Sequence, residues 1–421
     1  MKKLKKLLVA LLTIALTLSL VACNSDQTNG ESSADSEVTD PSQVPSEYSD
    51  VTGWKPTYVI GSHQPLSGSG APYGQGILNG LKVAVAEQND AGGILGAKIE
   101  IIEYDDANNT ETAVQCVTRL VKEDKVDAIQ ASCTSGSILA AGPIYEEGKV
   151  ITMAGGNAVS VMDQGWRYVY RTTANNDCAA TSLIDVCEQL GIQEVYIFHG
   201  AYENGTAGVE SFENALSESG ANVTIIGKES YENGDVDYSG QCNKIAAAEP
   251  DAVFTVANSQ DLGSFAKQLR AAGYEGHVLG TVNWVSNDVL EVAGSAADGV
   301  ICASCELLYE SPEECTDPAM KAFCEKYLEM FGEMPANDQP YRGYDGAKIL
   351  FEAIERCRSF DSTDIRNEID KMNDYVGLQS KGNNADGTYD FTISKDGEGL
   401  QQVACWVIDN GKFVAFDEYF S

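Results

Sequence analysis

The stretch from Tyr58 to Gly96 constrains the fold more than any other part of the chain, because it holds a strand, a loop, a helix and a turn in succession. The apolar run Tyr58–Gly61 precedes a loop rich in Gly, Ser and Pro. The helix predicted after this loop has one apolar stripe at the spacing i, i+4, i+7 and i+8, formed by Ile77, Leu81, Ala84 and Val85. The run Asn89–Gly93 ends the helix, since glycine tolerates the left-handed backbone of helix C-termini.

The same alternation continues along the chain. The next predicted strands and helices are Ile99–Tyr104, Thr112–Lys122, Ala128–Ala131, Ser137–Glu147 and Val150–Ala154. After Arg171–Thr173 the pattern begins again, with Ala179–Leu190, Glu194–Phe198, Gly208–Ser219, Val223–Gly227, Ser239–Ala248, Ala252–Val256, Leu262–Ala272 and His277–Gly280. Strands that alternate with helices indicate parallel sheets covered on both faces. Two such series in 421 residues predict two α/β lobes.

The rhythm changes beyond Gly299. Long helices are predicted at Pro318–Phe331, Gly343–Arg356 and Thr363–Asn373, followed by β-like segments at Tyr389–Ile393 and Gln402–Asp409. The pattern alone does not say which lobe these elements join.

The N-terminal segment is typical of an export signal. Four lysines precede the apolar run Leu7–Leu20, which is short for a membrane span, and Leu-Val-Ala-Cys ends at Cys23. This ending resembles a bacterial lipobox, which implies cleavage after residue 22 and a lipid on Cys23; an uncleaved anchor helix is the alternative. Residues 24–53 are polar and lack Lys, Arg, Phe and Trp, so we expect a disordered tether from Cys23 through residue 53.

The charge of the chain argues against some partners. Removal of the four signal lysines leaves 24 basic and 63 acidic residues, and 24 − 63 = −39. Nucleic acid and anionic lipid headgroups are therefore not expected as partners. The charge does not identify a ligand, since it serves solubility equally well.

The cysteines and histidines do not favour an enzyme or a metal site. Eleven cysteines follow Cys23, so one or two local disulfides or buried free thiols are expected. Cys302 and Cys305 could begin a zinc site, but Cys315 and Cys324 lack the paired spacing, and we expect no metal. The three histidines have no metal-ligand spacing and no G-x-S-x-G elbow occurs. The glycines of a dinucleotide loop are also misplaced, with the third, Gly74, one residue late. We expect no cofactor.

Two loops are candidates for binding, because ligands of parallel sheets lie beyond the carboxyl ends of strands, near helix N-termini. One is Ala131–Ser137, whose hydroxyls and backbone amides, including those of Ser135 and Gly136, could hold a carboxylate or an amide oxygen. The other is Ala154–Asn157, where Gly155 and Gly156 allow a ligand to approach the backbone. The alternative is that the hydroxyls only cap helices.

The runs LSGSGAPYGQG and NDAGGILG resemble the opening of the type I solute-binding proteins of ABC transporters, the family of the leucine/isoleucine/valine-binding receptors. The resemblance is clear from about residue 57 to 299 and weaker beyond. It implies two Rossmann-like lobes with parallel sheets joined by a three-strand hinge. Lobe 1 would comprise residues 54–175 and 306–385, and lobe 2 residues 176–305 and 386–421, with crossovers near 174–177, 303–308 and 386–399. It also implies a monomer outside the cytoplasm that delivers a small ligand, with an amino acid as the first expectation, to an ABC permease.

The resemblance assigns site residues by position. They are Ser135, Gly156 and Asn157 for the ligand's carboxylate, Tyr73 for its side chain, and Tyr202 or Asn204, Asn258, Asn283 and Trp284 on the second lobe. Arg342 could reach the cleft or be solvated. One departure affects specificity: where the amino-acid receptors place an acid for the ammonium, this chain has Val282. Unless Asp177 or another acid replaces it, amides, urea-like compounds or aromatic acids become alternatives to branched-chain amino acids. The same fold could also serve a membrane sensor.

Overall fold

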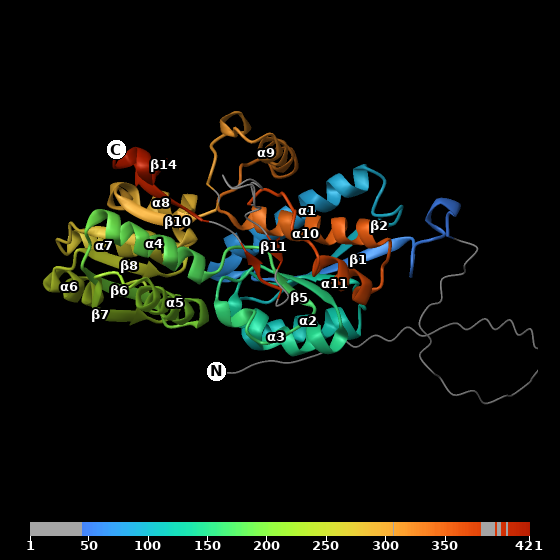
Figure 1. Cartoon of the computed structure of the whole chain (residues 1–421), viewed down its shortest axis with the longest axis horizontal. Coiled ribbons are helices and arrows are strands. Elements are labelled where there is room, and N and C mark those ends of the chain that lie inside the picture. Colours follow the sequence, from blue (N-terminus) through green and yellow to red (C-terminus); the bar gives the residue numbers. More distant parts are fainter. Residues whose placement is uncertain (1–43, 306, 380–391, 394–396, 401–402) are drawn as a thin grey trace, which may run out of the picture. The chain divides into compact units, whose positions relative to one another are not determined.

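The computed structural model describes residues 44–305, 307–379, 392–393, 397–400 and 403–421. The predicted signal segment, Cys23 and residues 24–43 lie outside the described residues. The described chain contains two large sheets, each covered by helices (Figure 1), as predicted for an α/β fold with two lobes. We call the first sheet with its helices lobe 1, and the second sheet with its helices lobe 2.

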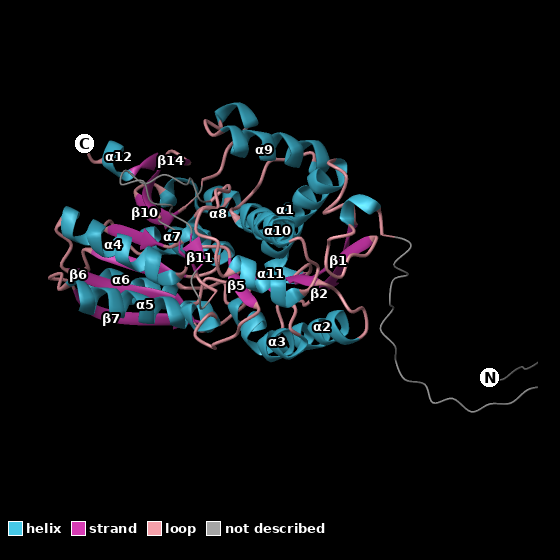
Figure 2. Ribbon diagram, turned by 45° about the vertical axis from the view of Figure 1, so that its right-hand side comes forward, coloured by secondary structure: helices cyan, strands magenta, loops and turns pink. Residues whose placement is uncertain are grey.

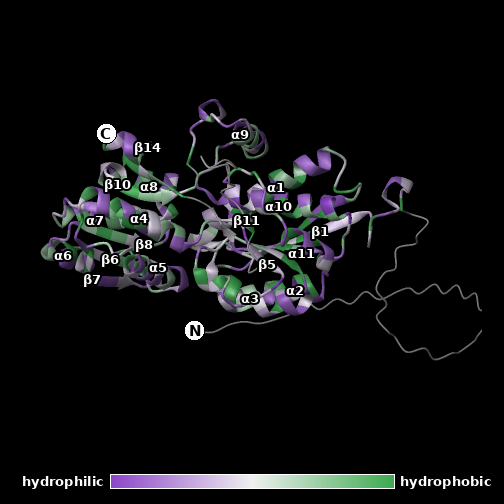
Figure 3. Cartoon of the chain, viewed as in Figure 1, coloured by the Kyte–Doolittle hydropathy of each residue, from purple (hydrophilic) through white to green (hydrophobic). Residues whose placement is uncertain are grey.

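The sheet of lobe 1 has five parallel strands in the order β2-β1-β3-β4-β5. These are β1 Thr57–Gln64, β2 Lys98–Asp105, β3 Ala128–Gln130, β4 Ile151–Ala154 and β5 Val169–Arg171. The connecting helices are α1 Ala71–Asp90, α2 Thr110–Lys122 and α3 Ser135–Gly148. On α1 the predicted stripe of Ile77, Leu81, Ala84 and Val85 is buried. Hydrophobic and hydrophilic residues share the outer helices α2 and α3 (Figure 3), as expected where one face of a helix covers a sheet.

Elements from the later part of the chain return to lobe 1. They are α9 Pro318–Phe331, α10 Gln339–Cys357, α11 Ser362–Ile369, β11 Thr392–Ile393 and β12 Gly399–Leu400. Helix α10 lies directly against α1: a Cβ placed on Gly80 would be 1.9 Å from the carbonyl oxygen of Pro340, and one on Gly343 would be 2.0 Å from that of Ile77. The two helix backbones therefore touch where glycine leaves room, and α1 is buried between the sheet and α10.

The sheet of lobe 2 has seven strands in the order β14-β13-β10-β9-β8-β6-β7. Its strands are β6 Glu194–Gly200, β7 Thr224–Tyr231, β8 Ala252–Val256, β9 His277–Gly280, β10 Val300–Ser304, β13 Ala404–Asp409 and β14 Lys412–Ala415. Its helices are α4 Asn176–Leu190, α5 Glu203–Ser219, α6 Ser239–Ala248, α7 Ser259–Ala271, α8 Asn287–Ala293 and α12 Phe416–Tyr419. Strand β13 runs antiparallel to its neighbours β10 and β14, and the other neighbouring strands are parallel, so the sheet is mainly parallel, with helices beside its strands (Figure 2).

The chain passes between the lobes three times. The first passage comprises residues 172–175, between β5 and α4. The second follows β10, near the predicted 303–308. The third comes later than the predicted 386–399, because Ile393 is buried in the core of lobe 1 and Glu398 pairs with Arg171 of β5 at 2.8 Å. The described residues 392–393 and 397–400 therefore belong to lobe 1, and β13, which begins at Ala404, belongs to lobe 2.

Residues 44–53 differ from the expected tether, because they pack on lobe 1. Val51 is buried in its core, and Tyr48 stacks on Trp54 with ring centroids 6.5 Å apart. The backbone of Thr52 exchanges hydrogen bonds with Arg358 and Phe360, at 3.1 and 2.8 Å. Because most residues of this stretch are polar, its composition did not indicate that apolar side chains such as those of Val51 and Tyr48 would pack on the lobe.

Within the described ranges, no helix is both long enough and apolar enough to span a bilayer. In the same ranges, no three His, Cys, Asp or Glu side chains gather as metal ligands. Cys187, Cys242 and Cys302 are buried free thiols.

Candidate functional site

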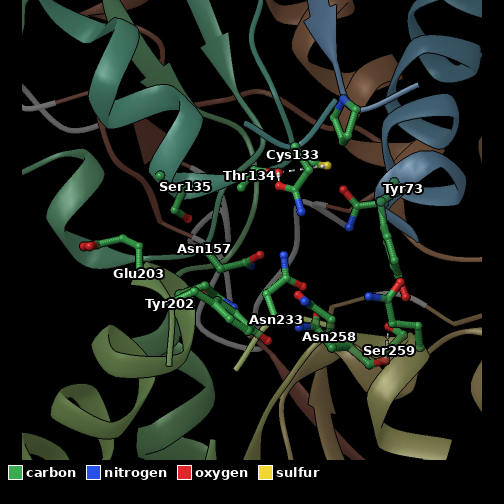
Figure 4. Close-up of a pocket in the computed structure, with 18 of the residues that line it drawn as sticks. Tyr73, Cys133, Thr134, Ser135, Asn157, Tyr202, Glu203, Asn233, Asn258 and Ser259 are labelled. Atoms are coloured by element: carbon green, nitrogen blue, oxygen red, sulfur yellow. Dashed lines mark hydrogen bonds between the residues drawn. The ribbon is translucent and has the colours of Figure 1, made fainter. Parts of the chain in front are cut away.

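A cavity of about 400 Å³ lies between the two lobes (Figure 4). Its walls come from the loops that follow β1, β2, β3 and β4 in lobe 1 and β6, β7, β8 and β9 in lobe 2, with contributions from α1 and α10. The lining residues are Pro65, Gly70, Tyr73, Asn108, Thr110, Cys133, Thr134, Ser135, Gly136, Asn157, Tyr202, Glu203, Asn204, Asn233, Asn258, Ser259, Gln260, Asn283 and Gln339. The carboxyl ends of both parallel sheets thus meet at one site, as the rule for open sheets predicts.

The N-terminus of α3 forms one end of this cavity. Thr134 precedes the helix and its hydroxyl donates to Asn108 Oδ1 at 3.1 Å instead of capping the helix. The Ser135 hydroxyl accepts from the backbone N–H of Ala158 at 3.2 Å, so its own hydrogen is available to a ligand. The amides of the first turn and the helix dipole add positive potential there. This end of the cavity therefore suits a carboxylate or a carbonyl oxygen.

Asn157 is held by contacts on both sides of its amide. Its Oδ1 accepts from Arg342 Nη1 at 2.7 Å, and its Nδ2 donates to the carbonyl of Ala174 at 2.7 Å. Arg342 is neither at the cavity nor solvated: it is 1% exposed, it also donates to Gly155 O at 2.7 Å, and it pairs with Asp338. A buried arginine of α10 thus fixes the loop after β4.

Hydroxyl groups of lobe 2 form a chain that ends on a buried carboxylate. Tyr231 donates to Asp261 Oδ2 at 2.7 Å, and Tyr238 donates to Asp261 Oδ1 at 3.0 Å. The Tyr202 hydroxyl lies 3.0 Å from that of Tyr231. Because Tyr231 uses its hydrogen on Asp261, Tyr202 donates to Tyr231 and leaves its oxygen as an acceptor. Desolvation raises the pKa of Asp261, and side-chain hydrogen bonds from Tyr231, Tyr238 and Asn258 oppose this shift.

A side-chain contact joins the lobes directly beside the cavity, where the Ser160 hydroxyl of lobe 1 donates to Glu203 Oε1 of α5 at 2.6 Å. Within lobe 2, Asn176, the first residue of α4, donates to Asn204 Oδ1 of α5 at 3.1 Å.

Most of the residues expected at the site line the cavity. They are Tyr73, Ser135, Gly136, Asn157, Tyr202, Asn204, Asn258 and Asn283. Tyr202 and Asn204, between which the sequence did not decide, both reach it. The residues that sequence reasoning missed include Asn108, Thr110, Asn233, Gln260 and Gln339. All but Gln339 follow a strand of one of the two sheets, so the same rule could have found them, whereas Gln339 begins α10, which follows no strand directly.

Two expected residues do not line the cavity. Trp284 is fully buried in the core of lobe 2, where its Nε1 donates to Thr255 Oγ1 at 2.9 Å. Gly156 lies behind Ser135, and a Cβ on it would be 2.6 Å from Ser135 Oγ. Because Gly156 has no side chain, the Ser135 side chain has room in its observed position.

The structure also shows where the residues discussed for binding an ammonium group lie. Asp177 is exposed in the first turn of α4 and does not line the cavity. Val282 is buried near the first passage and is not among the residues that line the cavity. Glu203 is the one carboxylate among the lining residues.

The lining residues carry no nucleophile with an adjacent base. Burial raises the pKa of the Cys133 thiol to about 12, so it stays protonated at neutral pH. His63 is buried behind the site, between Asp106 at 3.1 Å and Tyr145 at 2.5 Å. The arrangement can bind a small molecule, and it offers no group poised for covalent chemistry.

Comparisons with known proteins agree with this geometry. A model of the family described as periplasmic binding protein matches residues 57–412. Leu/Ile/Val-binding protein homolog 7 of Brucella melitensis is 25% identical over 343 residues, which cover 77% of this chain and 83% of that protein. The Leu/Ile/Val-binding protein of Escherichia coli is 27% identical over 245 residues, or 58% of this chain and 65% of that protein.

Solved structures share the fold at low identity. A leucine-binding protein from Thermotoga maritima superposes with a TM-score of 0.74 at 24% identity, over 85% of this chain and 97% of that one. A solute-binding protein from R. palustris in complex with benzoate gives 0.73 at 20% identity, over 86% and 95%.

Proposed function

Because the chain belongs to the periplasmic binding protein family, it is an extracytoplasmic solute-binding protein and not an enzyme, and we propose that it delivers a small carboxylic acid to an ABC permease. The cavity carries this proposal: residues of both lobes surround it, and the Ser135 end offers a hydroxyl and free helix amides to an anion. Branched-chain amino acids and aromatic acids are the first candidates, since relatives and structures of similar fold include a Leu/Ile/Val-binding protein and a benzoate complex.

The proposal extends to the attachment of the protein. The lipobox at residues 20–23 supports a lipid on Cys23, which would hold the binding body beside its permease. Labelling of growing cells with a radioactive fatty acid tests this, because label should appear in the wild type and be absent from Cys23→Ala.

A thermal-shift screen of the purified protein against amino acids, aromatic acids, amides and ureas tests the function. A ligand at 100 times its dissociation constant should add about 2.7 kcal/mol if it binds only the folded protein. Stabilisation by amides or ureas alone, with no response to any carboxylic acid, would contradict the proposal.

Replacement of Ser135 by alanine is expected to weaken binding of whichever acid the screen identifies by about 10- to 100-fold, since a hydrogen bond to a charged group is lost. Isothermal titration calorimetry measures the change. Ser137→Ala is the matched control, because Ser137 is buried in the same helix turn but does not line the cavity. Equal affinities of Ser135→Ala and wild type would remove Ser135 from the site.

A further inference from the structure

The cavity is lined by an unusual number of side-chain amides and by no cationic side chain. The amides are those of Asn108, Asn157, Asn204, Asn233, Asn258, Asn283, Gln260 and Gln339. Amides can donate or accept hydrogen bonds, so their existing partners decide which atom each of them presents to a ligand. The two ends of the cavity differ in this respect.

The end at α3 presents donors. Because Asn108 Oδ1 accepts from Thr134, the Nδ2 of Asn108 remains available to donate to a ligand. The hydroxyl of Ser135 and the backbone amide of Gly136 are further donors at this end. These groups match an anionic or carbonyl oxygen, as the proposed function requires.

The opposite end presents acceptors. Gln339 Nε2 donates to Asp338 Oδ1 at 3.0 Å. Because a carboxylate only accepts hydrogen bonds, the amide nitrogen must face it, and Gln339 Oε1 is the atom that remains to accept from a ligand. That oxygen is buried without a hydrogen-bond partner, on a side chain that is 4% exposed. Likewise, Asn283 Nδ2 donates to the carbonyl of Ala257 at 2.7 Å, which leaves Asn283 Oδ1. A buried acceptor without a donor costs free energy, so a ligand that donates there is favoured.

The carboxylate next to Gln339, that of Asp338, is not free to hold a cation, because it pairs with Arg342 and accepts from Gln339 Nε2. Figure 4 shows Asn258 and Ser259 across the cavity from Ser135, while the side chain of Glu203 is directed away from them. Glu203 accepts from Ser160, and the oxygens of Asp261 are taken by Tyr231 and Tyr238 behind the wall. A buried ammonium without an anionic partner is costly, whereas a neutral O–H or N–H needs only an acceptor such as Gln339 Oε1.

We propose that the ligand is a carboxylic acid whose second polar group is an uncharged hydrogen-bond donor, such as a hydroxyl or an amide, and not a zwitterionic amino acid. This inference rests on the proposed function and narrows it to one class of acid. The carboxylate lies at Ser135, and the neutral donor lies at Gln339 and Asn283.

Matched probes separate the two classes. Calorimetry on the purified protein would compare 4-hydroxybenzoate with 4-(aminomethyl)benzoate, in which an ammonium replaces the hydroxyl, because both carry the second polar group at the end of the molecule opposite the carboxylate. The hydroxy acid is expected to bind about tenfold or more tightly than the ammonium acid, the ratio that follows from one costly unpaired charge. Tighter binding of the ammonium acid would overturn the inference and leave the carboxylic-acid receptor intact. Failure of both probes, and of benzoate, leucine and phenylalanine, would overturn both proposals.

The variant Gln339→Met assigns the acceptor, because methionine keeps the volume and removes the oxygen. It is expected to weaken binding of 4-hydroxybenzoate about tenfold, while binding of benzoate, which has no second polar group, changes by less than about twofold. An equal loss for both probes would overturn the role of Gln339 and with it the placement of the donor. The melting temperature of the ligand-free variant shows that it is folded.

Discussion

Replacement of Arg342 by methionine is expected to destabilise the protein by about 3–5 kcal/mol, the usual result when one partner of a buried ion pair is removed. The change leaves the Asp338 carboxylate, 5% exposed, without its cation, and it removes the donor to Gly155 O and Asn157 Oδ1. Urea unfolding followed by circular dichroism measures the loss. Ligand affinity should also fall, because Asn157 is no longer held at the cavity.

Two further variants test the reason given for this effect. Arg358→Met removes an exposed pair with Asp50 and should change stability little, since water screens such pairs. Arg342→Met combined with Asp338→Asn should recover part of the lost stability, because the buried charge is then gone. If Arg342→Met alone lost as little stability as Arg358→Met, the buried arginine would not be what holds the loop after β4.

Replacement of Gly80 by alanine is the second change with a large expected effect, about 3 kcal/mol or more of lost stability. The added methyl would meet the carbonyl oxygen of Pro340 at 1.9 Å, and backbone cannot rotate away as a side chain can. Helices α1 and α10 would have to separate, and α10 begins with Gln339 at the cavity. Alanine's better helix propensity offsets only about 1 kcal/mol.

The matched control is Gly240→Ala in α6, where an added Cβ meets nothing within 4 Å. It should be neutral or stabilise the protein by up to about 1 kcal/mol. Differential scanning calorimetry of both variants gives the comparison. If Gly80→Ala melts at the temperature of Gly240→Ala, the contact between α1 and α10 is looser than the structure has it.

Elements with regular patterns and clear ends were predictable from the sequence. The structure reproduces the predicted bounds of α6, β8, β9 and α9 without change. Strand β5 was missed because its last residue is Arg171, whose buried guanidinium bonds to backbone carbonyls at 2.7 and 2.9 Å and pairs with Glu398. Strand β10 was not predicted, because its five buried residues, Val300–Ser304, overlap the crossover expected near residues 303–308.

The site was predictable where it follows the carboxyl ends of strands, since local sequence determines those ends. The positions of Gln339 and Arg342 were not predictable, because both residues belong to a helix some 180 residues beyond Asn157 in the sequence. Nothing near Arg342 in the sequence distinguishes a buried arginine from a solvated one. Such long-range contacts are set by packing of whole elements, here α10 on α1.

The hydrogen bond from Ser160 of lobe 1 to Glu203 of lobe 2 stabilises the arrangement in which both lobes face the cavity. When only a fraction of the molecules has the binding-competent arrangement, the apparent dissociation constant is the intrinsic one divided by that fraction. A contact that raises this fraction therefore tightens binding. Ser160 does not line the cavity, so its replacement would change the affinity without changing the groups that recognise the solute.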